Sequence, residues 1–86
     1  MALTPDQIQQ AGSVVAEAAS IRAAVVLLRR EFAGMQASVV DAMDIRDETP
    51  VLQLGPRAIY LAASNGHCWS VTADPARADA FILTEA

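Results

Sequence analysis

Hydrophobic residues recur at helical spacing through the first 33 residues of the chain. The segment Thr4-Pro5-Asp6-Gln7 is typical of a helix start, because Thr4 and Gln7 can form a capping box and Pro5 suits the first helical position. The hydrophobic positions that follow are spaced to share one helix face: Ile8, Ala11, Val15 and Ala18. The pattern predicts a helix near residues 5–18.

A second helical period begins after Ser20, a residue suited to cap a new helix. A hydrophobic stripe follows at Ile21, Val25, Leu28 and Phe32. Gly34 is placed to end this helix, because glycine adopts a positive φ without steric cost. Nothing at residues 18–20 breaks a helix, so residues 5–18 and 20–33 form either one helix or two. We favour two.

The second half of the chain changes to short hydrophobic runs that are typical of strands. The predicted strands lie at residues 35–43, 57–63, 67–72 and 80–84, and a short extended piece is expected at 51–54. A polar stretch at 44–50 follows the first strand, Gly55-Pro56 forms a turn, and Asp74 begins a one-turn helix. This order predicts a single α+β domain over residues 1–86, with two N-terminal helices packed on one face of a small antiparallel sheet of three or four strands.

Asn65-Gly66 lies between two predicted strands and favours a two-residue hairpin turn, because both residues tolerate a positive φ. Such a turn fixes which residues stand opposite each other. The expected pairs are Ser64 with His67, Ala63 with Cys68, Ala62 with Trp69, and Tyr60 with Val71. One face of the hairpin then carries Tyr60, Ala62, Trp69 and Val71, with His67 near the tip.

Both faces of this hairpin are substantially hydrophobic, although two helices can cover only one face of a sheet. We expect the Tyr60/Trp69 face to meet a second subunit or another partner, because exposed apolar patches usually mark interaction sites. The predicted contact residues are Tyr60, Trp69 and His67. Two alternatives are that the last strand folds over this face, or that Trp69 packs along the sheet edge.

Composition narrows the classes of function. Of the 86 residues 53% are hydrophobic, but only four are aromatic, so the core is thin and a partner or oligomer is expected. The net charge of −4 makes nucleic acid an unfavourable partner. The longest strictly apolar run, residues 23–28, is far shorter than the roughly 20 residues that span a bilayer, so we expect a cytoplasmic protein without membrane contact. The arginines of the second helix, Arg22, Arg29 and Arg30, are expected to be solvated.

Candidate chemistry is sparse. His67 and Cys68 are neighbours, and neighbouring strand residues point to opposite faces, so they do not converge on a metal ion or a substrate. The chain also has no second histidine to activate a cysteine nucleophile. The acidic residues Asp41, Asp44, Asp47 and Glu48 lack the spacing of a calcium-binding loop, and a solvated loop is expected there. We therefore expect no cofactor, no metal site and no enzymatic activity.

Several motifs of the C-terminal part resemble those of a known family. They are Leu-Arg-Arg-Glu-Phe-Ala-Gly at 28–34, Ile-Tyr-Leu at 59–61, Gly-His-Cys at 66–68, Ser-Val-Thr-Ala-Asp-Pro at 70–75 and the final Ile-Leu-Thr-Glu. Residues 28–86 thereby resemble a family of small uncharacterised proteobacterial proteins, which are often labelled nitrogen fixation proteins. The acids at 41–48 are dispersed, where the family tends to have an unbroken acidic run. The resemblance implies a nitrogen-fixation context and supplies no catalytic residue.

The sequence thus predicts a non-enzymatic accessory or adaptor protein that acts through protein–protein contacts, with a homodimer as one expected form. The alternative is a module that binds a small ligand or a metal through His67, with carboxylates from neighbouring strands or from a second subunit.

Overall fold

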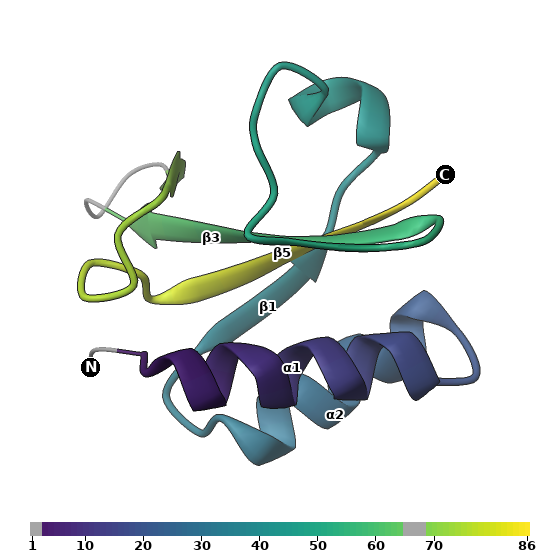
Figure 1. The fold of residues 1–86 in the computed structure, drawn as a ribbon, viewed down its shortest axis with the longest axis horizontal. Coiled ribbons are helices and arrows are strands. Elements are labelled where there is room, and N and C mark those ends of the chain that lie inside the picture. The colour runs from purple at the N-terminus through teal and green to yellow at the C-terminus, as the bar shows by residue number, and fades with distance from the viewer. Residues whose placement is uncertain (1–2, 65–68) are drawn as a thin grey trace.

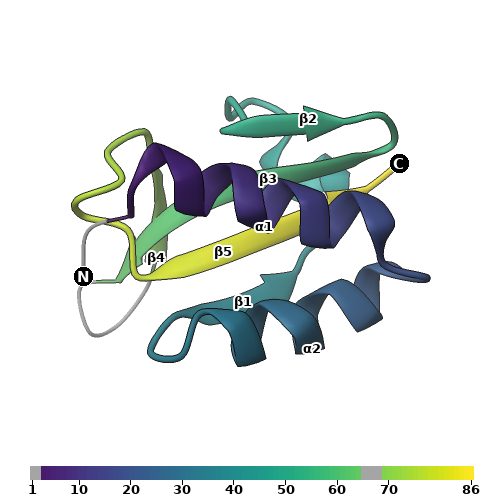
Figure 2. The ribbon, with the colours of Figure 1, turned by 60° about the horizontal axis from the view of Figure 1, so that its bottom comes forward.

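A computed structural model describes residues 3–64 and 69–86 and shows an α+β fold. Helices α1 (Pro5–Glu17) and α2 (Ile21–Glu31) lie together on one face of a five-stranded sheet (Figure 1) (Figure 2). The other elements are β1 (Gln36–Val39), the 3₁₀ helix η1 (Ala42–Ile45), β2 (Leu52–Leu54), β3 (Arg57–Ser64), β4 (Trp69–Thr72) and β5 (Ala80–Glu85). The predicted α+β class and the packing of both helices on one face are confirmed.

The N-terminal part forms two helices, because side chains cap both starts. The Thr4 hydroxyl accepts a hydrogen bond from the Gln7 amide at 3.1 Å, and the Gln7 side chain accepts one from the Thr4 amide at 2.9 Å. The Ser20 hydroxyl accepts one from the Ala23 amide at 3.0 Å. Between them, Ala18 has extended backbone angles, φ −64° and ψ 144°, which end α1. The sequence left open whether residues 5–18 and 20–33 form one helix or two, and the Ser20 cap starts a second helix.

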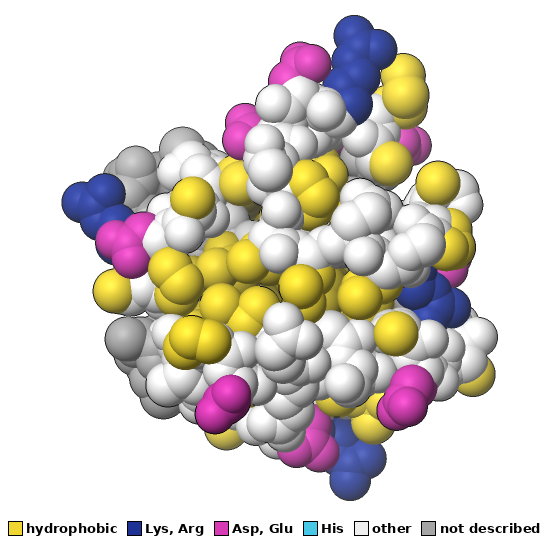
Figure 3. All heavy atoms as spheres, viewed as in Figure 1, with side chains coloured by type: hydrophobic (Ala, Val, Ile, Leu, Met, Phe, Trp, Pro, Cys, Tyr) yellow, Lys and Arg dark blue, Asp and Glu magenta, His cyan; other side chains and the backbone are white. Residues whose placement is uncertain are grey.

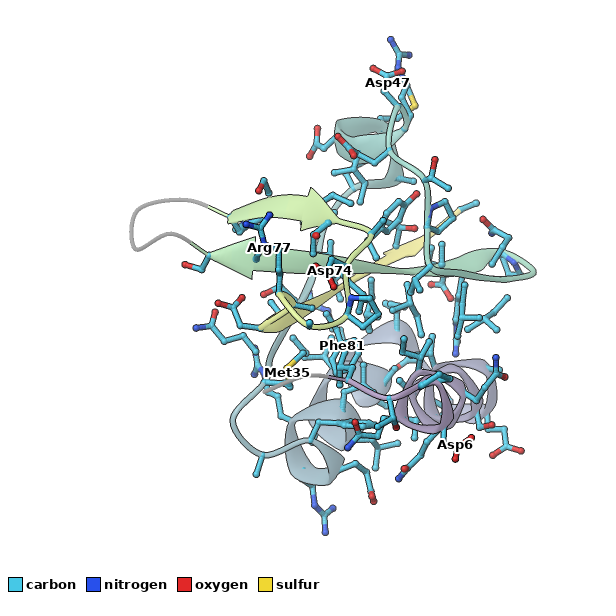
Figure 4. All side chains as sticks on the ribbon, turned by 60° about the vertical axis from the view of Figure 1, so that its left-hand side comes forward. Asp6, Met35, Asp47, Asp74, Arg77 and Phe81 are labelled. Carbon is cyan, nitrogen blue, oxygen red and sulfur yellow. The ribbon has the colours of Figure 1, made fainter. Side chains whose placement is uncertain are left out.

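The predicted helix stripes form the main core. Ala11 and Val15 of α1, and Val25, Leu28 and Phe32 at α2, are buried against the sheet. Their partners on the helix side of the sheet include Ile59 and Leu61 of β3 and Phe81 and Leu83 of β5. The rings of Phe32 and Phe81 meet edge to face with centroids 5.2 Å apart. Figure 4 shows Phe81 pointing from the sheet toward the helices.

The sheet differs from the prediction in strand number and direction. It has five strands and is mixed, because β1 runs parallel to β5 while β3 runs antiparallel to its neighbours β2, β4 and β5. The expectation of three or four purely antiparallel strands was therefore wrong. Residues 80–84 are all buried, as expected for a central strand covered on both faces. Hydrophobic pattern predicted where the strands lie, but strand direction depends on how the intervening chain crosses the sheet.

The predicted register of the β3–β4 hairpin was also wrong. Ser64 pairs with Trp69 and Ala62 with Val71, so the register lies two residues from the one that a turn at Asn65-Gly66 would give. That turn itself lies outside the described residues. A register shift of two residues leaves every side chain on its predicted face of the sheet, because side chains alternate between the faces with a period of two residues. The turn predicted at Gly55-Pro56 is a two-residue hairpin turn between β2 and β3, in which Gly55 has φ +66°.

Two loops also differ from the prediction. The first strand is shorter than residues 35–43, because Asp41 caps η1 by accepting a hydrogen bond from the Met43 amide at 2.9 Å. The predicted one-turn helix after Asp74 is a hydrogen-bonded turn. There the Arg77 amide donates to the Asp74 carbonyl at 3.1 Å, and the Ala76 amide donates to the Asp74 carboxylate at 2.9 Å. Both aspartates satisfy nearby amides, which shortens the regular elements beside them.

Arg57 joins three parts of the fold. Its guanidinium donates from Nη1 to the carbonyls of Val15 at 2.7 Å and Ala18 at 2.8 Å, at the C-terminal end of α1. Its Nε also forms an ion pair with Glu85 of β5 at 2.7 Å. A positive charge at the C-terminal end of a helix interacts favourably with the negative end of the helix dipole. Arg57 thereby fixes the C-terminal end of α1 over the start of β3, a role that the sequence did not signal.

Candidate functional site

The second face of the sheet holds a smaller core, which a lobe of residues 40–50 covers in part. The lobe stands over the sheet on the side away from the helices (Figure 1), and Asp47 lies at its outer end (Figure 4). Ile45 of the lobe is buried against Tyr60 of β3 and Ile82 of β5. The lobe therefore covers the part of this face that holds Tyr60 and Ile82. Neither the last strand folding over, nor Trp69 packing along the edge, accounts for the burial of Tyr60.

The structure does not bring together Tyr60 and Trp69, two of the three predicted contact residues. Tyr60 is 7% exposed beneath the lobe, whereas Trp69 is 44% exposed at the start of β4. Trp69 stands opposite Ser64, four residues along β3 from Tyr60, which corresponds to about 13 Å of strand. His67 lies outside the described residues. Trp69 is thus the described member of the predicted set that offers a large exposed surface.

Hydrophobic side chains also reach the surface elsewhere on the molecule. In Figure 3 they form a band across the face between the lobe above and α1 below, with charged side chains toward the rim. The large hydrophobic residues with the greatest exposure among those described are Val26, Leu27, Val39, Met43 and Trp69. Three of these five, Val26, Leu27 and Val39, belong to α2 and β1.

The α2–β1 groove is a hollow of about 590 Å³ between these two elements. Its α2 wall consists of Ile21, Arg22, Val25, Val26 and Arg29, and its β1 wall of Ser38 and Val39. Val26 is 54% exposed and Val39 43% exposed, so both walls present hydrophobic surface to solvent. In Figure 2, β1 is the outermost strand on its side of the sheet and α2 runs beside it.

The edge of β1 beside the groove is open. Within residues 3–64 and 69–86, β1 pairs with β5 alone. The Gln36 amide donates to the Asp79 carbonyl at 3.1 Å and the Val40 amide to the Leu83 carbonyl at 3.0 Å, so alternate residues of β1 face β5. The amide and carbonyl groups of Ala37 and Val39 consequently point away from β5, toward the groove side.

Arg29 protects one of these edge groups. Its Nη2 donates a hydrogen bond of 2.8 Å to the Ala37 carbonyl, a contact that the sequence did not predict, while the residue itself is exposed as expected. The guanidinium thus occupies the position that the amide of an added strand would take. Arg22 also lines the groove, and among the described residues no acidic one lines it. The groove is therefore a cationic, partly hydrophobic site on a chain of net charge −4.

Sequence reasoning did not find this groove, although one signal was present. Val26 and Leu27 fall off the buried stripe of the second helix, which leaves two large hydrophobic residues on its outer side. An amphipathic surface helix usually places polar residues there. The open edge of β1, in contrast, follows from strand order, which the sequence pattern did not contain.

The described residues also bear on metal binding and on membrane spans. Among residues 3–64 and 69–86, no three His, Cys, Asp or Glu side chains gather closely enough to hold a metal ion. His67, on which the ligand-binding alternative depends, is not among these residues. No helix in the described part of the chain is long and hydrophobic enough to cross a membrane.

The chain was also compared with known proteins. No family model, curated protein or solved structure matches it. The resemblance of residues 28–86 to the proteobacterial family therefore stays a prediction.

Proposed function

We propose that this chain is a non-enzymatic accessory or adaptor protein that acts through protein–protein contacts. The observation that carries the proposal is the open edge of β1 beside the hydrophobic wall of α2. An open strand edge offers main-chain donors and acceptors to another chain, and a neighbouring groove selects the side chains of that chain. The groove thus offers both affinity and specificity for an extended protein segment.

The exposed hydrophobic residues at this edge support the same function. Proteins usually protect an edge strand with charge, proline, a bulge or a covering segment, because an open edge pairs with other chains. Here Arg29 covers one carbonyl, while Val26 and Val39 stay exposed beside the remaining edge groups. An interaction surface explains why hydrophobic side chains are kept at this edge.

We expect the wild-type chain to select peptides from a random-peptide display library, and Val26→Glu to lose this selection. The substitution places a charge in the hydrophobic wall of the groove and keeps good helix propensity. Enrichment over a surface without protein is the measurement. Leu27→Glu is the matched control, because Leu27 is exposed on the same helix and does not line the groove. Absence of enrichment on the wild-type chain would contradict the proposed function.

Self-association through Trp69 is a further element of the proposal. A partly exposed tryptophan is a frequent contact residue in protein interfaces. We expect the mass measured by light scattering to rise with protein concentration and the Trp69 emission to shift to shorter wavelength in parallel. Trp69 is the sole tryptophan, so its emission reports this surface alone. Trp69→Ala should abolish the rise in mass, and a monomer at all concentrations would refute the homodimer.

The nitrogen-fixation context is the part of the proposal that rests on the sequence resemblance over residues 28–86. It concerns the pathway in which the contacts are used. The contact function itself rests on the α2–β1 groove and is independent of that context.

A further inference from the structure

We propose that the α2–β1 groove binds an extended segment of a partner protein that carries two carboxylate side chains flanking a hydrophobic one, added as a strand along the open edge of β1. This inference rests on the proposed function and names the chemistry of the partner. Three observations carry it: the free groups of the strand edge, the spacing of the two arginines, and the position of the Arg29 guanidinium.

The strand edge supplies the main-chain contacts. Three groups on the open side of β1 have no hydrogen-bond partner within residues 3–64 and 69–86: the Ala37 amide and the amide and carbonyl of Val39. An extended chain laid along β1 would pair with all three. A helical or compact partner segment offers no matching row of donors and acceptors, so the edge favours an extended occupant.

The α2 wall supplies the side-chain contacts. Arg22 and Arg29 are seven residues apart, which places them on the same side of the helix about 10.5 Å apart along its axis. Val25 and Val26 lie between them. Side chains on one face of an added strand recur every two residues, so its first and third lie about 13 Å apart. A strand with the order acid, hydrophobic, acid on that face therefore matches the two arginines and the valines between them.

Charge argues against a second copy of this chain as the occupant. Pairing of β1 with β1 about a two-fold axis places the same surface on both sides of the interface. Arg22 and Arg29 of one copy would then face those of the other, and like charges oppose such an arrangement. The chain's own acidic lobe is also a poor occupant, because its residues 42–45 form a 3₁₀ helix and are not extended.

Arg29 can keep a hydrogen-bond partner both when the edge of β1 is open and when a strand is bound there. In the structure its guanidinium donates to the Ala37 carbonyl. An added strand would donate its own amide to that carbonyl and offer a carboxylate to the guanidinium, so both hydrogen-bonding groups exchange partners and neither is left without one. Binding would thus replace the one hydrogen bond at this position by two, of which the bond between the guanidinium and the carboxylate is charge-assisted.

The test is a titration of the ¹⁵N-labelled full chain with the peptide acetyl-Thr-Glu-Thr-Val-Thr-Glu-Thr-amide, followed by amide chemical shifts. We expect the largest shifts at the Ala37 and Val39 amides. The control peptide with Gln in place of both Glu should bind about fivefold more weakly, because two partly exposed ion pairs are lost. Arg22→Gln should lower the affinity for the Glu peptide and leave the affinity for the Gln peptide unchanged. Arg30 does not line the groove, so Arg30→Gln should change neither affinity. The spectra of the variants report directly that they are folded.

Three outcomes would overturn this inference: equal affinity for the two peptides, largest shifts at residues outside β1 and α2, or no binding of either peptide. A dimer of this chain that dissociates on Val26→Glu would also overturn it, because a second copy of the chain would then be the occupant of the groove. These results differ from a failure of the proposed function. If display selection enriches peptides without acidic residues, the contact function stands and the carboxylate specificity fails; if it enriches none, the contact function fails.

Discussion

Arg57→Met is expected to lower the free energy of unfolding by about 3 kcal/mol, because hydrogen bonds to a charged group contribute more than neutral ones and lost partners leave polar groups unsatisfied. Methionine keeps much of the hydrophobic stem and removes the guanidinium. The substitution leaves the Val15 and Ala18 carbonyls and the Glu85 carboxylate without this donor. The side chain of Arg57 is only 15% exposed, so water replaces these contacts incompletely.

The measurement is urea unfolding at neutral pH, and two variants separate the contributions. Glu85→Gln removes only the ion pair, whose carboxylate is partly exposed, so a loss of less than about 1 kcal/mol is expected. Arg57→Lys retains a charge but not the planar fork that reaches both the helix carbonyls and Glu85, so its stability should fall between the wild type and Arg57→Met. If Glu85→Gln were as destabilising as Arg57→Met, the contacts of Arg57 with the end of α1 would contribute nothing.

Phe81→Ala is expected to cost about 3–5 kcal/mol, the range found when a buried phenylalanine is truncated. Phe81 is buried near the start of β5 and meets Phe32 edge to face. For a chain of 86 residues the whole free energy of unfolding is about 4–13 kcal/mol, so this one change is expected to leave a large unfolded fraction. The core between helices and sheet holds only two phenylalanines, which gives each a large share of its volume.

Far-ultraviolet circular dichroism during thermal unfolding measures this loss. Phe81→Leu should recover most of the stability, because it retains a large hydrophobic side chain at the same position. Leu27→Ala serves as the control for a large hydrophobic residue at the surface, and its effect should be small because Leu27 is 37% exposed. A Phe81→Ala chain as stable as Leu27→Ala would show that Phe81 is not part of the packed core.

The two proposed contact surfaces, the α2–β1 groove and the surface around Trp69, are independent of each other. The α2–β1 groove and the exposed Trp69 lie on elements that do not pair with each other, since β1 adjoins β5 and β4 adjoins β3. A partner strand at β1 would therefore leave Trp69 free for a second contact. An adaptor needs two such independent surfaces, and the Val26→Glu and Trp69→Ala variants distinguish them.

The local features of this protein were determined by its sequence. Thr4 and Ser20 cap the two helices through amides three residues away, and the stripes through Val15 and Leu28 are buried as their spacing predicted. Gly55-Pro56 forms the turn that its composition predicts. Interactions of this kind involve residues a few positions apart, so a short stretch of sequence contains both partners. The face assignment of the β3–β4 hairpin belongs here too, since it depends only on the alternation of side chains.

The tertiary structure alone decided the features that depend on distant partners. The parallel pairing of β1 with β5, the cover of the second face by Ile45, and the contact of Arg57 with Val15 join segments that are tens of residues apart. The proposed contact surface also depends on distant partners. Trp69 could be named from the sequence, but the open edge of β1 exists because of strand order, and the groove exists because α2 lies beside that edge. Local pattern specifies each element, whereas the packing of all elements together determines which edge and which face stay open.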